Sequence, residues 1–306
     1  MNKVIILVGP TGVGKTAVSI LLAKELDTEI ISADSMQIYR HMDIGTAKPS
    51  IEEKTMVKHH MIDIVDPWES YSTGKYITEV VPIIDNLHRK GKIPIVVGGT
   101  GLYIKAMTRG IFSGPPADWN LREELLSMDK EERGSLYNYL KEFDPDAAGK
   151  ITPNDTRRVI RALEVCLKSN ASISELQKNR TQPLPYDFIK IGLTRDRKEL
   201  YRIIEERVAI MIESGLVEEV ENILTMNPDR TPLQAIGYKE IAMYLYGHIT
   251  SDEAIRLITR GTKRYAKRQF TWFRKEEGIH WIDITGTYDK HGAFMRVSNI
   301  MGSILK

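Results

Sequence analysis

The sequence of 306 residues has a single cysteine and no long hydrophobic run. One cysteine, Cys166, excludes a disulfide framework and a cysteine metal cluster, and its apolar helical neighbours indicate a small core residue. No apolar run approaches the roughly 20 residues of a membrane-spanning helix. The stretch Met1-Asn2-Lys3 leads straight into the first predicted strand, which leaves no room for a cleavable signal. We therefore expect a cytoplasmic protein without membrane contact, and we take it to be a monomer.

The composition is that of a soluble globular protein, because 42% of the residues are hydrophobic and 27% are charged. The net charge of +2 is too small to indicate a partner by itself. The length suits one α/β domain that carries an insertion better than two equal domains.

The most informative stretch is Gly9-Pro10-Thr11-Gly12-Val13-Gly14-Lys15-Thr16. It stands between the apolar run 4–8 and the apolar-periodic stretch 17–26, so strand, glycine-rich turn and helix are predicted, as a phosphate loop requires. Such a loop turns backbone N–H groups toward a phosphate at the positive end of the helix. Lys15 adds a charge, and the Thr16 hydroxyl is placed to hold Mg²⁺. The alternative is a glycine-rich turn that binds nothing, and the pattern does not say which phosphate is held.

Alternating segments predict an α/β fold: a P-loop parallel sheet core flanked by helices. Further strands are predicted at 29–32, 61–65, 93–97, 188–193 and 280–283, and core helices at 72–89, 196–214, 216–224, 234–246 and 251–274. Residues 41–60 are predicted to be irregular. His59 and His60 are expected to be solvated rather than a metal pair, because adjacent side chains diverge.

Two strand ends carry the remaining polar candidates of the core. Asp34 follows the strand 29–32, and the carboxyl ends of parallel strands face the ligand crevice, so Asp34 should lie near the phosphate loop. The alternative is that Asp34 or Ser35 only caps the next turn. The strand 93–97 ends in Gly98-Gly99-Thr100, where a nucleoside-triphosphatase would place an aspartate for Mg²⁺ and water. This absence argues against hydrolysis of nucleoside triphosphates and leaves diphosphate binding open.

An inserted all-helical subdomain is predicted between two parts of the core. The composition changes at Ser113, and proline-rich residues 181–185 mark the return, so the predicted parts are 1–112, 113–186 and 187–306. Helices are predicted at 120–128, at 131–143 and from Thr152, with a turn at 144–146 and no strand pattern.

Positive charge is gathered in two places. Arg157, Arg158 and Arg161 share one side of a helix in the insertion. Near the C-terminus, a run without an acidic residue contains Arg256, Arg260, Lys263, Arg264, Lys267, Arg268, Arg274 and Lys275. An unpaired stripe of this kind favours a nucleic acid partner over a solvated face. Three hypotheses follow: a kinase with a helical lid, an enzyme that transfers a group from a diphosphate donor to RNA, and a nucleotide-gated RNA-binding switch. The missing aspartate weighs against the first and third.

Six ordered motifs resemble the bacterial tRNA dimethylallyltransferases, also called the IPP transferase family. They are the phosphate loop at 9–16, Ser32-Ala33-Asp34-Ser35-Met36-Gln37-Ile38-Tyr39, Val97-Gly98-Gly99-Thr100-Gly101-Leu102-Tyr103, the stretch 154–164, Gly237-Tyr238-Lys239-Glu240, and 263–274. Together they span nearly the full length. The chain departs from the family in having Gly12-Val13 where Ala-Ser is frequent, and Ile203 where an arginine is common.

The resemblance implies transfer of a dimethylallyl group from dimethylallyl diphosphate to N6 of adenosine 37, next to the anticodon of tRNA. It implies that residues 9–16 and Arg207 bind the diphosphate as a leaving group, with Lys15 stabilising it and Mg²⁺ on Thr16. Asp34 would be the general base, and Thr100 would contact donor and nucleotide. The residues implied to bind tRNA are Asp34, Ser35, Met36, Gln37, Thr100, Arg122, Arg157, Arg158, Arg161, Lys263, Arg264, Lys267 and Arg268. Of these, Ser35 and Gln37 would contact flanking bases.

Overall fold

The computed structural model describes residues 2–112, 114–169 and 171–304. The chain divides into two compact units, which we call the core (Met1–Ile104 with Pro185–Lys306) and the insertion (Lys105–Leu184). The sequence places the first boundary later, at Ser113, which lies outside the described residues. Each unit is described by itself below.

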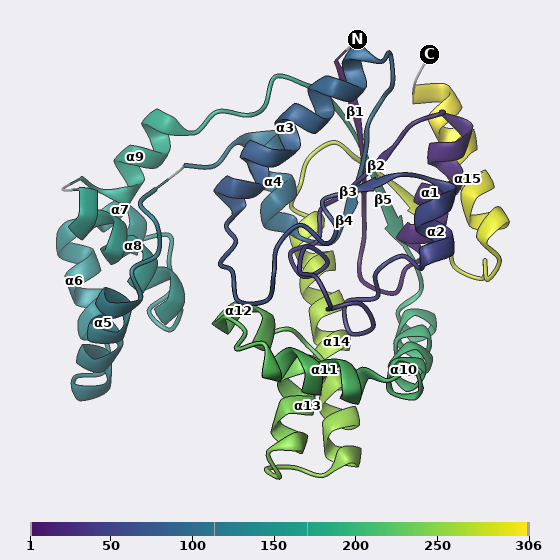
Figure 1. Ribbon diagram of the computed structural model, residues 1–306. Coiled ribbons are helices and arrows are strands. Elements are labelled where there is room, and N and C mark those ends of the chain that lie inside the picture. Colours follow the sequence, from purple (N-terminus) through teal and green to yellow (C-terminus); the bar gives the residue numbers. More distant parts are fainter. Residues whose placement is uncertain (1, 113, 170, 305–306) are drawn as a thin grey trace. The chain divides into compact units, whose positions relative to one another are not determined.

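The core contains a six-stranded parallel sheet, which confirms the predicted α/β fold (Figure 1). Its strands are β1 (Lys3–Val8), β2 (Ile30–Ser32), β3 (His59–His60), β4 (Ile95–Gly98), β5 (Asp187–Thr194) and β6 (Ile279–Asp283), in the order β3-β2-β4-β1-β5-β6. β1 is central and fully buried from Val4 to Leu7. Val8 at its end pairs in register with Gly98 and Gly192, so the loops that follow β1 and β4 leave the sheet side by side.

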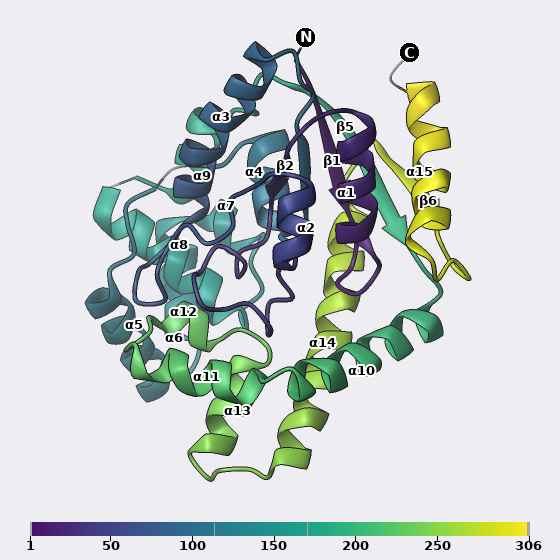
Figure 2. The ribbon, with the colours of Figure 1, turned by 45° about the vertical axis from the view of Figure 1, so that its right-hand side comes forward.

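Helices cover both faces of this sheet. α1 (Lys15–Glu25) and α15 (Lys290–Ile304) lie on one side and α3 (Thr73–Arg89) on the other, as Figures 1 and 2 both show. At the carboxyl ends of the strands lie α10 (Arg197–Glu213), α11 (Leu216–Thr225), α12 (Arg230–Leu233), α13 (Tyr238–Leu245) and α14 (Ser251–Phe273) (Figure 2). α14 packs against both α10 and α13. α4 (Gly101–Arg109) begins in the core directly after β4.

The prediction that residues 41–60 are irregular is wrong in two places. α2 (Ile51–Met56) begins at a capping box in which Ser50 Oγ accepts from the Glu53 N–H at 3.1 Å and the Glu53 carboxylate accepts from the Ser50 N–H at 3.0 Å. The short edge strand β3 follows. Its histidines are half-buried rather than solvated, because His60 Nε2 lies 2.6 Å from Glu29 Oε2 and His59 Nδ1 lies 2.8 Å from the Val57 carbonyl oxygen.

The strand predicted at 61–65 does not form. Met61 and Asp63 have φ angles of 61° and 56°, in the left-handed region that a strand excludes. Only Val65 keeps a strand-like contact, a single parallel bridge to Tyr39. The sheet therefore receives its edge strand two residues earlier than the apolar pattern suggested.

The insertion is helical in its described residues, with α5 (Trp119–Glu131), α6 (Ser135–Phe143), α7 (Pro145–Ala148), α8 (Thr156–Ser169) and α9 (Ile173–Arg180). Its own hydrophobic core includes Leu125, Leu140 and Leu163. The turn predicted at 144–146 is instead the start of α7, where the Asp144 carboxylate accepts from the Ala147 N–H at 2.9 Å. Cys166 is buried and unbridged, as expected of a small core residue. No helix in the described part of the chain is long and apolar enough to cross a membrane.

Candidate active site

The loop between β1 and α1 has the backbone of a phosphate-binding turn. Gly14 caps α1 with a φ of 109°, a conformation that favours glycine. A Cβ atom on Gly9 would lie 2.7 Å from the Leu193 carbonyl oxygen, so only glycine fits between this loop and β5. The first turn of α1 leaves the N–H groups of Lys15 and Thr16 without an acceptor inside the helix. The loop therefore presents free N–H groups at the positive end of a helix.

Lys15 is folded back over this loop. Its Nζ donates to the carbonyl oxygens of Gly9 and Pro10, both at 2.9 Å. Burial lowers the pKa of Lys15 to about 8; the negative charge of Asp34 opposes this, and the positive charge of Arg207 adds to it. A bound anion would stabilise the charged form of Lys15 and so offset part of the free-energy cost of burying it.

Asp34 follows β2 and uses only one of its carboxylate oxygens within the protein. Oδ1 accepts from the N–H groups of Met36 at 2.9 Å and Gln37 at 3.3 Å. No group in the described part of the chain donates to Oδ2. The capping interpretation of Asp34 is thus supported, and it leaves the second oxygen available for chemistry.

Thr100 and Gln37 hold the segment that follows Asp34. The Thr100 hydroxyl oxygen accepts from the Ser35 N–H at 3.0 Å and donates to the Ser35 hydroxyl at 3.3 Å. The Gln37 amide donates to the carbonyl oxygens of Thr46 and Ala47 at 3.3 and 3.2 Å and accepts from the Ser32 hydroxyl at 3.1 Å. A contact from Gln37 to an RNA base would therefore have to replace bonds that this amide already makes.

The loop that Gln37 contacts is anchored from α11. The Glu219 carboxylate accepts from three successive N–H groups, of Asp43 at 2.8 Å, Ile44 at 2.7 Å and Gly45 at 3.0 Å. The Tyr238 hydroxyl donates to the same carboxylate at 2.5 Å. Tyr238 stands in one of the six motifs, but Glu219 was not singled out in the sequence, because a carboxylate that binds a distant loop leaves no local pattern.

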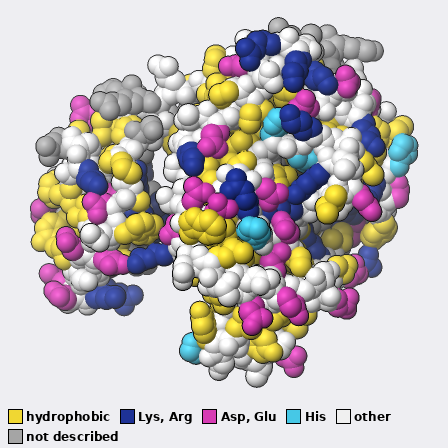
Figure 3. All heavy atoms as spheres, in the orientation of Figure 1, with side chains coloured by type: hydrophobic (Ala, Val, Ile, Leu, Met, Phe, Trp, Pro, Cys, Tyr) yellow, Lys and Arg dark blue, Asp and Glu magenta, His cyan; other side chains and the backbone are white. Residues whose placement is uncertain are grey.

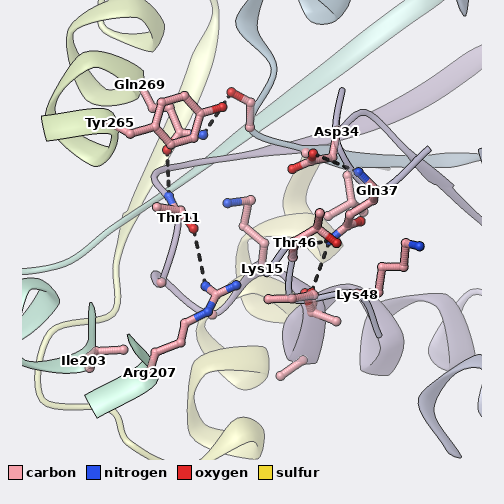
Figure 4. A pocket seen from close by; sticks show the side chains of 18 of the residues that line it. Thr11, Lys15, Asp34, Gln37, Thr46, Lys48, Ile203, Arg207, Tyr265 and Gln269 are labelled. Carbon is pink, nitrogen blue, oxygen red and sulfur yellow. Dashed lines mark hydrogen bonds between the residues drawn. The ribbon is translucent and has the colours of Figure 1, made fainter. Parts of the chain in front are cut away.

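Two cavities share Asp34 as a lining residue. Figure 4 shows the side chains around the first of them. The first, of about 350 Å³, is lined by the phosphate loop, including Lys15 and Thr16. The second, of about 270 Å³, is lined by Ser35, Met36 and Arg268 and by apolar side chains of α10, α11 and α14. Residues lining both are Thr11, Asp34, Thr46, Arg207 and Tyr265. This arrangement suits a reaction between two molecules that lie on either side of the shared residues.

Arg207 of α10 brings a second positive charge to the first cavity. Its Nη1 donates to the Thr11 hydroxyl at 3.3 Å, and burial lowers its pKa while Asp34 raises it. Ile203, one turn earlier on α10, lines the same cavity without charge. The cationic side of this cavity therefore consists of Lys15, Lys48 and Arg207. Lys48 is already bonded, since its Nζ donates to Asp43 at 2.7 Å and to Asp63 at 2.5 Å.

The arginine cluster predicted in the insertion is partly neutralised by a buried carboxylate. Glu164, with a fully buried side chain, accepts two hydrogen bonds from Arg122 at 2.9 and 2.8 Å, another from Arg161, and one from the Asp118 N–H at 2.7 Å. Burial raises the pKa of Glu164, but these donors outweigh it and hold the pKa below its ordinary value. Arg158 is exposed and lies 3.3 Å from Asp155, and Arg157 is exposed.

The stripe of eight cations near the C-terminus is also partly paired. Arg256 forms an ion pair with Glu253 at 2.6 Å, and Lys263 with Glu205 of α10. Arg264, Lys267 and Arg268 are exposed on α14. On the face shown in Figure 3, Lys and Arg side chains are interspersed with Asp and Glu side chains, so the positive charge forms no continuous patch there.

Metal ligands are sparse in the described residues. No group of three or more His, Cys, Asp or Glu side chains is placed to hold a metal ion in that part of the chain. The Thr16 side chain lines the first cavity, where its hydroxyl oxygen could serve as one ligand of an ion bound together with a phosphate.

Comparison with known proteins confirms the resemblance that the motifs indicated. The family model described as IPP transferase matches residues 37–276. The chain is 60% identical to the tRNA dimethylallyltransferase of Thermodesulfovibrio yellowstonii over 94% of both chains, and 48% identical to that of Thermotoga maritima over 92% of this chain and 93% of the relative.

Solved structures agree with these relatives. The full-length tRNA isopentenylpyrophosphate transferase of Bacillus halodurans is 42% identical, with a TM-score of 0.74 over 99% of this chain and 96% of its own. A eukaryotic dimethylallyltransferase acting on tRNA is 30% identical, with a TM-score of 0.84 over 100% of this chain and 80% of its own. The chain therefore belongs to the IPP transferase family and is a transferase.

Proposed function

We propose that this transferase moves a dimethylallyl group from dimethylallyl diphosphate to the N6 amine of adenosine 37 of tRNA, next to the anticodon, and releases diphosphate. Relatives named tRNA dimethylallyltransferase support this assignment over nearly the whole chain. The observation that carries the residue roles is the position of Asp34. It lies where two cavities meet, with one carboxylate oxygen held by backbone N–H groups and the other without a donor in the described residues.

The first cavity binds the diphosphate in this proposal. The free N–H groups of the loop, Lys15, Thr11 and Arg207 surround the position where negative charge grows as the carbon–oxygen bond breaks. Thr16 would hold Mg²⁺, and the ion would neutralise charge on the diphosphate. The protein groups alone already provide a cationic, hydrogen-bonding pocket for the leaving group.

The second cavity receives the adenine in this proposal. Its apolar walls suit the faces of a purine, and the base must leave its stack to enter. The N6 amine is a weak nucleophile because its lone pair is delocalised into the ring. Asp34 Oδ2 takes the amine proton while nitrogen bonds to C1 of the dimethylallyl group and C1 separates from the diphosphate oxygen. Proton removal by a general base of this kind raises a rate by about 10²–10⁴. Thr100, bonded to Ser35, contacts donor and nucleotide.

The remaining tRNA contacts are proposed on both units. Ser35, Met36 and Gln37 contact bases beside the target. In the insertion, Arg157 and Arg158 contact backbone phosphates, and Arg122 and Arg161 add the N–H groups that Glu164 does not engage. On α14 the contacts are proposed for Lys263, Arg264, Lys267 and Arg268. Phosphate contacts position the RNA without specifying its sequence.

The proposal is tested by incubating the protein with unmodified tRNA and either labelled dimethylallyl diphosphate or γ-labelled ATP. Only the isoprenoid label should enter RNA, and entry of the phosphate label would contradict the proposal. Asp34→Asn keeps an oxygen for the Met36 and Gln37 N–H groups but cannot accept the proton. We expect turnover to fall by about 10²–10⁴ with diphosphate binding retained. A variant that keeps more than about a tenth of the activity would remove Asp34 from the base role.

A further inference from the structure

Gln269 is a buried amide on a helix whose exposed side chains are mainly cationic. The residue is 5% exposed, whereas its neighbours Lys267 and Arg268 are exposed. Tyr265 and Trp272, four residues before and three after it, share its face of α14, and Tyr265 lines both cavities. Gln269 thus belongs to the side of α14 that faces the site.

The amide of Gln269 joins two loops that leave the sheet from neighbouring strands. Its Oε1 accepts from the Thr11 N–H in the phosphate loop at 2.8 Å, a bond drawn in Figure 4. Its Nε2 donates to the Gly99 carbonyl oxygen after β4 at 3.0 Å. A primary amide is the side chain that offers an acceptor and a donor in one rigid plane. If the amide were reversed, its NH₂ group would face the Thr11 N–H and its oxygen would face the Gly99 carbonyl oxygen, and neither hydrogen bond could form.

The turn after β4 fits closely around this face of α14. A Cβ atom on Gly99 would lie 2.1 Å from Gln269 Nε2, and a Cβ atom on Gly101 would lie 2.3 Å from Trp272 Nε1. Both glycines flank Thr100, whose hydroxyl is bonded to Ser35. The position of Thr100 and Ser35 therefore depends on how α14 seats against this turn.

We propose that Gln269 is a positioning residue that fixes the phosphate loop relative to the turn after β4, and so sets the distance between donor and acceptor. The proposal rests on the proposed function, in which the phosphate loop binds the diphosphate of the donor. There, Asp34 contacts the acceptor, and Thr100 contacts donor and acceptor. Gln269 lines the first cavity, but both polar atoms of its amide are bonded to the two loops. It acts through the backbone of Thr11 on one side and of Gly99 on the other.

This role has a kinetic consequence. Most of the proposed donor contacts come from the phosphate loop, and the turn after β4 contributes fewer of them, so each substrate should still bind when the two loops lose their link. The transfer step requires both loops at the correct separation, and a displacement of about 1 Å lowers the rate by about a hundredfold. Loss of Gln269 should therefore lower kcat much more than it lowers the affinity for either substrate.

The first test uses Gln269→Met, which keeps the length of the side chain and removes both hydrogen bonds. We expect kcat at saturating donor and tRNA to fall about tenfold to a hundredfold, with the Kd for inorganic diphosphate and for tRNA changed less than about threefold. Amide exchange measured by NMR should be at least about tenfold faster at Thr11, because its N–H loses its acceptor. Unchanged kcat, an equal loss of diphosphate affinity, or unchanged exchange at Thr11 would overturn the proposal.

The second test uses Gln269→Glu, in which a proton decides whether the link exists. The ionised carboxylate accepts from Thr11 but repels the Gly99 carbonyl, whereas the protonated acid both accepts and donates. Burial and the Gly99 carbonyl raise the pKa of the introduced carboxyl group. Residue 269 lines the first cavity, and the ionisable side chains that line it with residue 269 are Lys15, Asp34, Lys48, Glu53, Arg207 and Tyr265. The activity of this variant relative to the parent should rise several-fold as the pH falls from 8 to 6.

A matched control makes the same chemical change at an exposed site. Gln177 is an exposed glutamine of α9, and Gln177→Glu should show a constant ratio to the parent between pH 8 and 6. A constant ratio for Gln269→Glu would assign its defect to packing alone and overturn the positioning role. A parent protein that transfers no isoprenoid would count against the proposed function, and the Thr11 exchange measurement would still decide the role of Gln269.

Discussion

Removal of the Glu164 carboxylate should destabilise the insertion strongly. Its side chain is fully buried and receives four hydrogen bonds, from Arg122 twice, Arg161 and the Asp118 N–H. Breaking a buried ion pair from one side costs about 3–5 kcal/mol, because the remaining charges stay buried. The side chains of Arg122 and Arg161 are 22% and 36% exposed, so water can partly solvate their charges after the carboxylate is removed. We therefore expect Glu164→Leu to lower the free energy of unfolding by about 3 kcal/mol, the lower end of this range.

Hydrogen exchange localises this effect to the insertion. A loss of about 3 kcal/mol corresponds to about a hundredfold faster exchange of the buried amides of α8, such as Val159 and Leu163. The exposed Glu142→Gln, in the same unit, should leave these amides unchanged. Adding Arg122→Met and Arg161→Met to Glu164→Leu should restore most of the stability, since no charge is then left unpaired. A triple variant no more stable than the single one would refute the ion-pair reasoning.

Three further predictions concern the core and the RNA contacts. Glu219→Gln should weaken the anchoring of residues 43–45, because a neutral amide accepts more weakly than a carboxylate from three backbone N–H groups; exchange of these amides should be about tenfold faster. Burial lowers the pKa of Lys15 to about 8, and the proposed function requires its protonated form to bind the donor, so kcat/KM for dimethylallyl diphosphate should fall about tenfold for each pH unit above 8; Lys15→Ala should lack this dependence. Arg157→Ala with Arg158→Ala should weaken tRNA binding and reduce its salt dependence, with donor affinity unchanged; equal loss of both would place these arginines at the donor site.

The parts of the fold that follow from local pattern were predictable. The phosphate loop, its flanking strand and helix and the parallel sheet depend on glycine spacing and on buried apolar runs, and all are found. The spacing of Ser50 and Glu53 is that of a capping box and indicates the start of α2, although no helix was predicted there. β3 has two residues and is an edge strand, too short to produce a periodicity.

The parts of the site that depend on distant partners were not predictable. The charge runs show where arginines and lysines stand, but not that Glu164 neutralises Arg161 or that Glu205 pairs with Lys263. Gln269 lies within a motif dominated by cations, and its two partners are 258 and 170 residues away in sequence. Such contacts are set by the packing of α14 against the sheet, which no single segment encodes.

The position of Lys15 links its lowered pKa to the proposed chemistry. In the structure its ammonium group is satisfied by two carbonyl oxygens of the loop, which only partly replace water. A bound diphosphate offers it a full negative charge, and that charge increases on the departing oxygen as the bond to the dimethylallyl group breaks. The interaction therefore strengthens along the reaction, which is the condition for an enzyme group to accelerate a step rather than only to bind the substrate. In the same proposal Asp34 acts on the adenine, and its negative charge is neutralised when it accepts the proton of the N6 amine. In the proposed reaction the charge of Lys15 thus meets the departing diphosphate, and the charge of Asp34 is neutralised by the proton that leaves the amine.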